Sequence, residues 1–147
     1  MTAFKRILVP HDFSDDAAAA LDWAIELAGQ LGAELHLLHA YRLPLEMFSP
    51  YGVPMPASVM PEIREAARRS LEELKARVEA AGLTGQIHLR EGPPADAIVE
   101  AARELSADLI VMGTRGRTGL AHVVLGSVAQ RTVRSAPCPV LTLKASR

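Results

Sequence analysis

The chain has 147 residues, is 49% hydrophobic but only 4% aromatic, and carries a formal net charge of −1. A charge near zero gives no overall attraction to nucleic acid or to an anionic membrane, and the single cysteine, Cys138, excludes an intramolecular disulfide framework and a Cys-based zinc finger. The first residues do not resemble a signal peptide, and no apolar run is long enough to span a bilayer. We therefore expect one domain over residues 1–147 and a cytoplasmic location.

Short apolar runs alternate with segments whose apolar residues recur every three or four positions. The first run ends at Pro10, because proline cannot continue a central ladder of hydrogen bonds. Ser14 is a typical N-cap for the following helix, where Asp15 and Asp16 suit the positive end of the helix dipole. Gly32 is a typical C-terminal stop. In chain order, the patterns predict strands at 4–9, 34–40, 86–91, 108–112 and 139–144, and helices at 15–31, 58–81, 94–105 and 127–134.

This order predicts an α/β fold: a single doubly wound, Rossmann-like, five-stranded parallel sheet with helices on both faces. In such sheets ligands bind beyond the carboxyl ends of the strands, where the strand order reverses. The loops after the first and fourth strands are therefore the first places to search. The segment 41–57 contains four prolines and is long for a connection, so both a functional flap and an unimportant surface loop stay open.

Charged residues four positions apart mark the outer face of the helix expected at 58–81. Glu65 precedes Arg69, and Glu73 precedes Arg77, which is the favourable order for ion pairs along a helix. These pairs indicate a solvated surface rather than a binding site.

The segment after the fourth strand has features of a phosphate-binding loop. Gly113, Gly116 and Gly126 allow backbone N–H groups to approach a ligand closely. Gly126 and Ser127 open a helix, whose N-terminus favours phosphate, and Arg115 adds positive charge. A flexible turn is the competing interpretation of the glycines alone. The segment is not a Walker A loop, because no Gly-Lys-Ser/Thr closes it, and no Gly-x-Gly-x-x-Gly follows the first strand.

Asp12 follows the first strand, at the expected reversal of strand order. Its carboxylate is suited to accept hydrogen bonds from a ribose or an adenine amino group, or to help hold Mg²⁺. The competing interpretation is that Asp12 only orders the turn.

The spacing of the three glycines and Ser127 resembles the ATP-binding motif of the universal stress protein family. Three further segments resemble that family's first, fourth and fifth strands: Val9–Ser14, Asp108–Gly113 and Cys138–Leu141. The resemblance covers essentially the whole chain. It implies a five-stranded parallel α/β fold, ATP with Mg²⁺ as the ligand, and a homodimer through the last strand, Val140–Lys144.

The resemblance also implies which residues contact ATP. Pro10 and Asp12 would face the adenosine, and Ala40 would touch the adenine, where the family often has valine. Met112 and Gly113 would line the nucleotide. The residues expected around the triphosphate are Arg115, Gly116, Gly126, Ser127 and Val128.

Three functions are compatible with the sequence. The first is a nucleotide-responsive stress or signalling module acting as a homodimer. The second is a slow ATPase using a water near Asp12 or Ser127, although no nucleophile–base pair can be recognised and no catalytic residue or metal ligand is assigned. The third is a nucleotide-independent protein-interaction module. We expect neither nucleic acid nor a membrane as a partner, and we expect the last strand to be an exposed edge that favours pairing with another chain.

Overall fold

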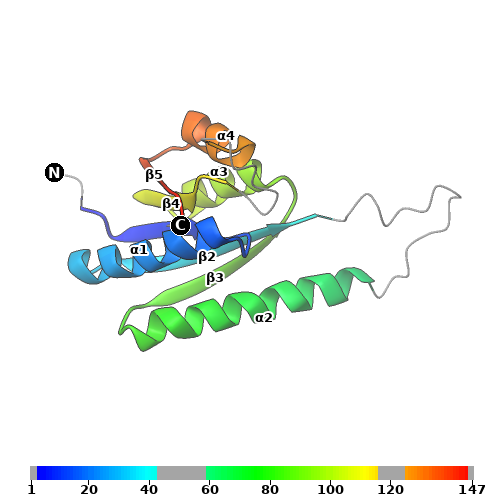
Figure 1. Ribbon diagram of the computed structural model, residues 1–147, viewed down its shortest axis with the longest axis horizontal. Helices are drawn as coiled ribbons and strands as arrows, with labels where there is room; N and C mark the ends of the chain where they lie inside the picture. The colour runs from blue at the N-terminus through cyan, green and yellow to red at the C-terminus, as the bar shows by residue number, and fades with distance from the viewer. Residues whose placement is uncertain (1–2, 43–58, 116–124, 146–147) are drawn as a thin grey trace, which may run out of the picture.

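A computed structural model describes residues 3–42, 59–115 and 125–145 (Figure 1). The strands are β1 (Arg6–Pro10), β2 (Glu34–Tyr41), β3 (Gly85–Glu91), β4 (Leu109–Gly113) and β5 (Val140–Leu143). The helices are α1 (Asp15–Leu31), α2 (Val59–Ala80), α3 (Pro94–Glu104) and α4 (Ser127–Ser135). All strand pairs are parallel and their order is β3-β2-β1-β4-β5, which confirms the predicted fold class.

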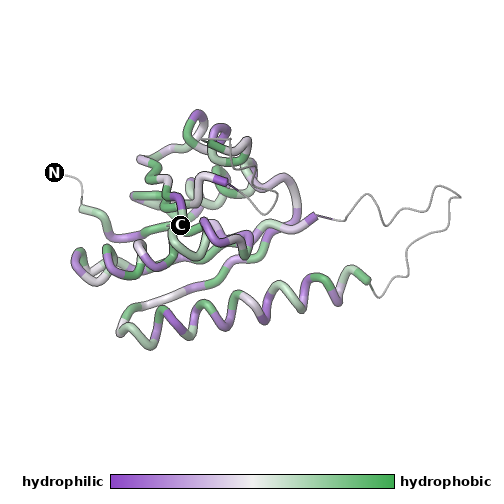
Figure 2. Tube along the Cα trace, viewed as in Figure 1, coloured by the Kyte–Doolittle hydropathy of each residue, from purple (hydrophilic) through white to green (hydrophobic). Residues whose placement is uncertain are grey.

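Helices cover both faces of the sheet, α1 and α2 on one and α3 and α4 on the other (Figure 1). Alternate residues of the central strands therefore enter two different cores. In β1, Ile7 and Val9 pack under α1 and α2, whereas Leu8 packs under α3 and α4. Figure 2 shows the consequence: the central strands are mostly hydrophobic, while α2 alternates between hydrophobic and hydrophilic residues along its length.

The ends of α1 lie where the sequence places them. The side chain of Ser14 accepts a hydrogen bond from the backbone N–H of Ala17 at 3.2 Å. At the other end Gly32 adopts a left-handed conformation with φ of 68°, and its N–H donates to the carbonyl of Ala28. The predicted N-cap and C-terminal stop are both confirmed.

Pro10 lies inside the sheet, contrary to the expectation that the strand stops before it. It is the last residue of β1 and is in register with Leu38 of β2. The pairing of β1 with β4 extends only to Leu8 and Ile110, so the missing N–H of Pro10 interrupts no ladder there. The two strands separate beyond this point, at the reversal of strand order.

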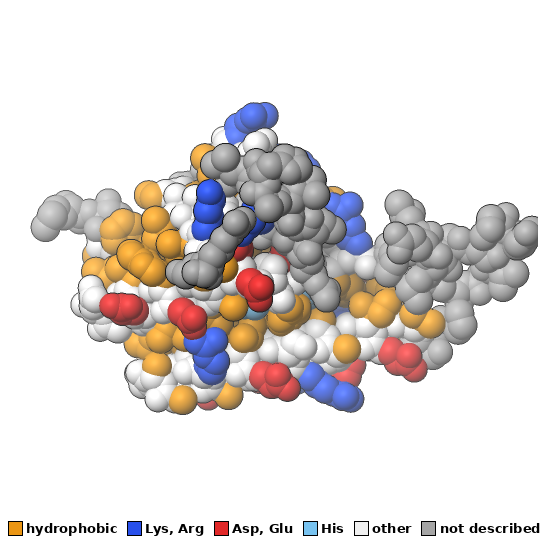
Figure 3. Space-filling view, in the orientation of Figure 1, with side chains coloured by type: hydrophobic (Ala, Val, Ile, Leu, Met, Phe, Trp, Pro, Cys, Tyr) orange, Lys and Arg blue, Asp and Glu red, His pale blue; other side chains and the backbone are white. Residues whose placement is uncertain are grey.

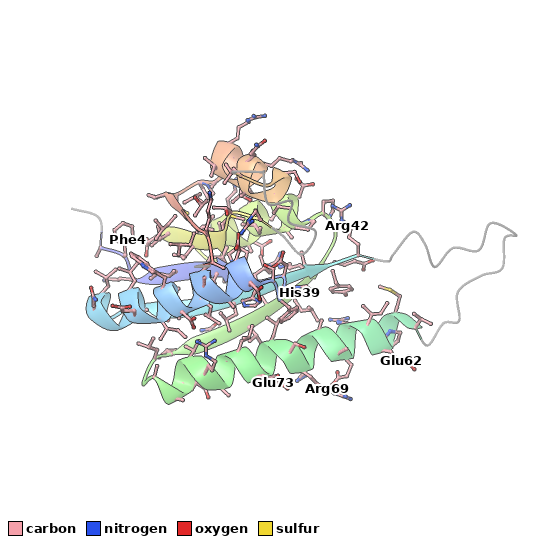
Figure 4. All side chains as sticks on the ribbon, viewed as in Figure 1. Phe4, His39, Arg42, Glu62, Arg69 and Glu73 are labelled. Atoms are coloured by element: carbon pink, nitrogen blue, oxygen red, sulfur yellow. The ribbon has the colours of Figure 1, made fainter. Side chains whose placement is uncertain are left out.

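The outer face of α2 is charged, as expected, but one of its ion pairs was predicted wrongly. Arg69 pairs with Glu65 at 3.7 Å. Arg77, however, pairs with Asp22 of α1 rather than with Glu73, because the two helices lie side by side on the same face of the sheet. Glu73 and Arg69 lie on the side of α2 away from the sheet (Figure 4).

The segment predicted at 41–57 lies outside the described residues apart from its first two positions. In the parts of the chain that the structure describes, no helix is both long and apolar enough to cross a membrane.

Candidate functional site

The carboxyl ends of β2, β1 and β4 open onto a cavity of about 450 Å³. This is the edge, and the reversal of strand order, where the sequence predicted a ligand site. Helix α3 contributes Pro94 and Ile98 to the wall, and α4 contributes its first residues. The volume lies within the range of about 300–1,000 Å³ that is usual for small-molecule sites.

Nine of the ten residues predicted for ligand binding line this cavity. They are Pro10, Asp12, Ala40, Met112, Gly113, Arg115, Gly126, Ser127 and Val128. The tenth, Gly116, lies outside the described residues. The structure thus brings four separate segments of the chain to one cavity, while their contacts with ATP stay a prediction.

Part of the cavity wall was missed by the sequence analysis. The additional lining residues that matter most are Leu38, Pro94, Ile98 and Thr114. The predicted site residues come from the ends of the first, second and fourth strands and from the start of α4, so the helix after the third strand was not included. Because β3 is parallel to the other strands, the helix that follows it, α3, begins at the same edge of the sheet. A parallel sheet, which the sequence predicted, already implies this position for α3.

Asp12 both orders the turn after β1 and lines the cavity. Its Oδ1 accepts hydrogen bonds from the backbone N–H of Ser14 at 3.1 Å and from the Ser14 hydroxyl at 2.5 Å. The two interpretations of Asp12 are therefore compatible, since the turn holds the carboxylate at the cavity.

A cluster of aromatic rings supports the turn from the α1 and α2 side. Phe13 has a φ of 64°, which is uncommon for a large side chain, and its ring lies 5.2 Å from that of His11 and 4.8 Å from that of His39. The His39 Nδ1–H donates to the carbonyl of His11 at 2.8 Å. In Figure 4, His39 lies on the side of β2 toward α2.

His11 is 6% exposed and is held as a neutral ring. Its Nδ1 accepts the backbone N–H of Phe13 at 3.0 Å, so Nε2 carries the proton of the neutral form. That Nε2 is buried without a hydrogen-bond partner among the described residues. Burial lowers the pKa of His11 to about 4, despite the opposing charge of Asp12.

Asp16 is the most heavily bonded carboxylate of the described chain. The sequence predicted only that its charge suits the first turn of a helix; the structure shows that it is also buried, at 4% exposed. It accepts hydrogen bonds from the Thr114 hydroxyl at 3.0 Å, from the Arg115 backbone and side chain, and from the Ala145 N–H at 2.9 Å. Burial alone raises the pKa of this carboxyl, but the hydrogen bonds outweigh burial and hold the pKa below its ordinary value.

Thr114 joins the two segments that carry the predicted phosphate-binding residues. Its carbonyl accepts the N–H of Gly126 at 2.6 Å, and its own N–H donates to Leu143 at the end of β5 at 2.9 Å. Gly126 is the N-cap residue of α4 and has no side chain to cap the helix. The first N–H groups of α4, at the edge of the cavity, therefore donate no bond to an N-cap side chain.

A second hollow, of about 570 Å³, lies at the other end of the strands from this cavity. Its lining includes Phe4, Leu31 and Thr84, near the amino ends of the strands. It contains none of the residues predicted for ligand binding.

Together these features define a class: a doubly wound α/β protein with a cavity of small-molecule size at the reversal of strand order. The particular family follows from comparison with known proteins. The chain belongs to the Universal stress protein family, whose profile matches residues 3–144.

Individual relatives extend this assignment. A universal stress protein of Thermus aquaticus is 42% identical over 147 residues, which cover 96% of this chain and 99% of the relative. A universal stress protein solved in complex with cAMP is 30% identical, with a TM-score of 0.73 and coverage of 99% of this chain and 100% of the other. The Archaeoglobus fulgidus universal stress protein in complex with dAMP is 25% identical, with a TM-score of 0.68 and coverage of 97% and 100%.

Proposed function

We propose that this protein binds ATP, accompanied by Mg²⁺, in the cavity at the carboxyl edge of the sheet, and acts as a nucleotide-responsive stress or signalling module. One observation carries the proposal: a single cavity joins an apolar wall to the N-terminus of α4 and to Arg115. An adenine nucleotide has the same two-part chemistry, a flat base at one end and phosphates at the other.

The apolar wall is suited to the base. Leu38 and Ala40 come from β2, Ile98 from α3 and Met112 from β4. Burial of a purine against such side chains is favourable, and the Asp12 carboxylate nearby is suited to accept hydrogen bonds from a ribose. The complexes of two relatives with cAMP and dAMP support an adenine nucleotide in particular.

The opposite end of the cavity is suited to phosphates. Since β1 lies between β2 and β4, Arg115 and Gly126 lie across the cavity from Ala40. The N-terminus of α4 offers backbone N–H groups and the positive end of a helix dipole. Mg²⁺ would be held by phosphate oxygens, with the Asp12 carboxylate as an oxygen ligand from the described residues.

Filling the apolar end tests the proposal. We expect Ala40→Phe to weaken ATP binding at least about tenfold, because the larger side chain takes up the space of the base. Affinity is measured by titration of a fluorescent ATP analogue, displaced by ATP. The matched control is Ala66→Phe, which adds the same side chain at an exposed position on α2. Unchanged ATP affinity in Ala40→Phe would place the nucleotide elsewhere.

We further propose that the module is a homodimer formed along β5. This strand lies at one edge of the sheet, where only β4 pairs with it among the described strands. Figure 3 shows hydrophobic side chains gathered over α1 toward β5, and Trp23 and Leu31 of α1 are each 45% exposed. The occupant that we propose for this edge is a second copy of the chain.

The hydrogen-bonding pattern of β5 allows a precise test of this edge. The carbonyls of Pro139 and Leu143 bond to the β4 side, so in a parallel ladder the backbone groups of Thr142 point the other way. We therefore expect Thr142→Pro to remove an outward N–H, leave the fold intact and convert the dimer to a monomer in sedimentation equilibrium. A folded variant that is still dimeric, or a monomeric parent chain, would contradict pairing through β5.

A further inference from the structure

The positive charge at the phosphate end of the cavity is already paired. The Nε–H of Arg115 donates to Oδ2 of Asp16 at 3.1 Å, and the Nη2–H donates to Oδ1 at 3.3 Å. The guanidinium thus binds the carboxylate side-on through two parallel bonds, a geometry that fixes its plane and direction. The Arg115 side chain is 19% exposed and lines the cavity.

This pairing leaves one edge of the guanidinium for another anion. Arginine has five N–H donors, and Asp16 engages two of them. Both protons of Nη1 and the second proton of Nη2 lie on the edge that faces away from the carboxylate. Arg115 is therefore able to hold Asp16 and a phosphate oxygen at the same time.

Asp16 is itself rigidly mounted. It lies in the first turn of α1, is 4% exposed, and accepts further hydrogen bonds from Thr114 and from the N–H of Ala145. Gly113 fits directly against its backbone. Thr114, Ala145 and Gly113 thus hold Asp16 in place. Its carboxylate can therefore fix the position of the long Arg115 side chain.

We propose that Asp16 is a positioning residue, which holds Arg115 so that its free edge meets the anionic part of the bound ligand. The inference rests on the proposed nucleotide function, because it assigns the phosphates to Arg115. A purely structural role for Asp16 is the alternative, since the same carboxylate also ties α1 to Thr114 and to the segment after β5.

The two roles differ in which ligand they affect, so the test compares ATP with adenosine, which lacks phosphates. We expect Arg115→Gln and Asp16→Asn each to weaken ATP binding about tenfold and to leave adenosine binding unchanged. The double variant should lose no more than either single variant. Removing a negative charge by itself strengthens the binding of an anion, so a weaker ATP affinity in Asp16→Asn points to the orientation of Arg115.

Three further variants separate positioning from stability. Val78→Ala removes buried side-chain atoms from α2, away from the cavity, and should lower the melting temperature while the ATP-to-adenosine ratio stays that of the parent chain. Asp15→Asn removes an exposed carboxylate from the same helical turn and should change neither quantity. Arg115→Lys keeps the charge but cannot bind the carboxylate side-on, so it should lose about as much ATP affinity as Arg115→Gln. This variant keeps the test decisive if Asp16→Asn does not fold.

The possible results are distinct. A parent chain that binds neither ligand contradicts the proposed function, and the role of Asp16 with it. A parent chain that prefers ATP, together with an Asp16→Asn or an Arg115→Lys variant that keeps this preference, overturns only the positioning role. An ATP-selective loss in these variants, with the ratio intact in Val78→Ala, supports it.

Discussion

Gly113→Ala is expected to destabilise the protein by about 3 kcal/mol, the upper part of the usual range for overpacking. A Cβ at this position would lie 2.8 Å from both the backbone carbon and the Cβ of Asp16, and 3.0 Å from the backbone nitrogen of Ala17. These are atoms of the first turn of α1, which cannot move away without shifting the helix. Thermal unfolding measures the effect, and we expect a fall in melting temperature of about 10 °C.

Gly29→Ala is the matched control for this substitution. Gly29 lies in α1, with nothing within 4 Å of the added Cβ. The same change there should stabilise the protein by about 1 kcal/mol, because alanine is the better helix former. Equal effects of the two substitutions would show that the end of β4 does not need a glycine to fit against α1.

Acidification from pH 6.5 to pH 4 is expected to remove about 3 kcal/mol of stability through His11 alone. Burial lowers its pKa from 6.5 to about 4 in the folded protein, so folding favours the neutral ring. The unfolded chain binds a proton at about pH 6.5, and the folded chain does so only near pH 4. The contribution of His11 is therefore complete above pH 6.5 and is lost as the pH falls toward 4.

Urea unfolding of the parent chain and of His11→Gln across this pH range tests the assignment. The stability of the variant should fall by about 3 kcal/mol less, because its side chain does not titrate. NMR titration of the His11 ring gives its pKa directly. Equal pH dependence in the two proteins, or a measured pKa near 6.5, would show that the ring is not buried as described.

The fold was predictable because its signals are local. The Ser14 cap, the Gly32 stop and the alternation of strand and helix patterns fix the elements of this chain, and right-handed connections then favour a doubly wound sheet. What the sequence did not show depends on tertiary neighbours. Arg77 pairs across to α1, and Pro10 lies in β1 because β4 has already separated from it there.

The candidate site was predictable in outline for a different reason. The glycines and Ser127 have a characteristic spacing, and the parallel sheet brings its loops to one edge. The burial of Asp16 was not predicted, because a carboxylate in the first turn of a helix is usually a surface charge. Its burial follows from the close approach of Gly113 and Thr114, residues almost a hundred positions away that no local pattern connects to α1.

We propose above all that an adenine nucleotide occupies the cavity at the carboxyl edge of the sheet. The most direct test is to follow backbone amide signals by NMR while ATP with Mg²⁺ is added to the nucleotide-free protein. We predict that the largest shifts occur at Asp12, Ala40, Gly113, Gly126 and Ser127. Absent shifts, or shifts concentrated at Phe4, Leu31 and Thr84 around the opposite hollow, would contradict this claim.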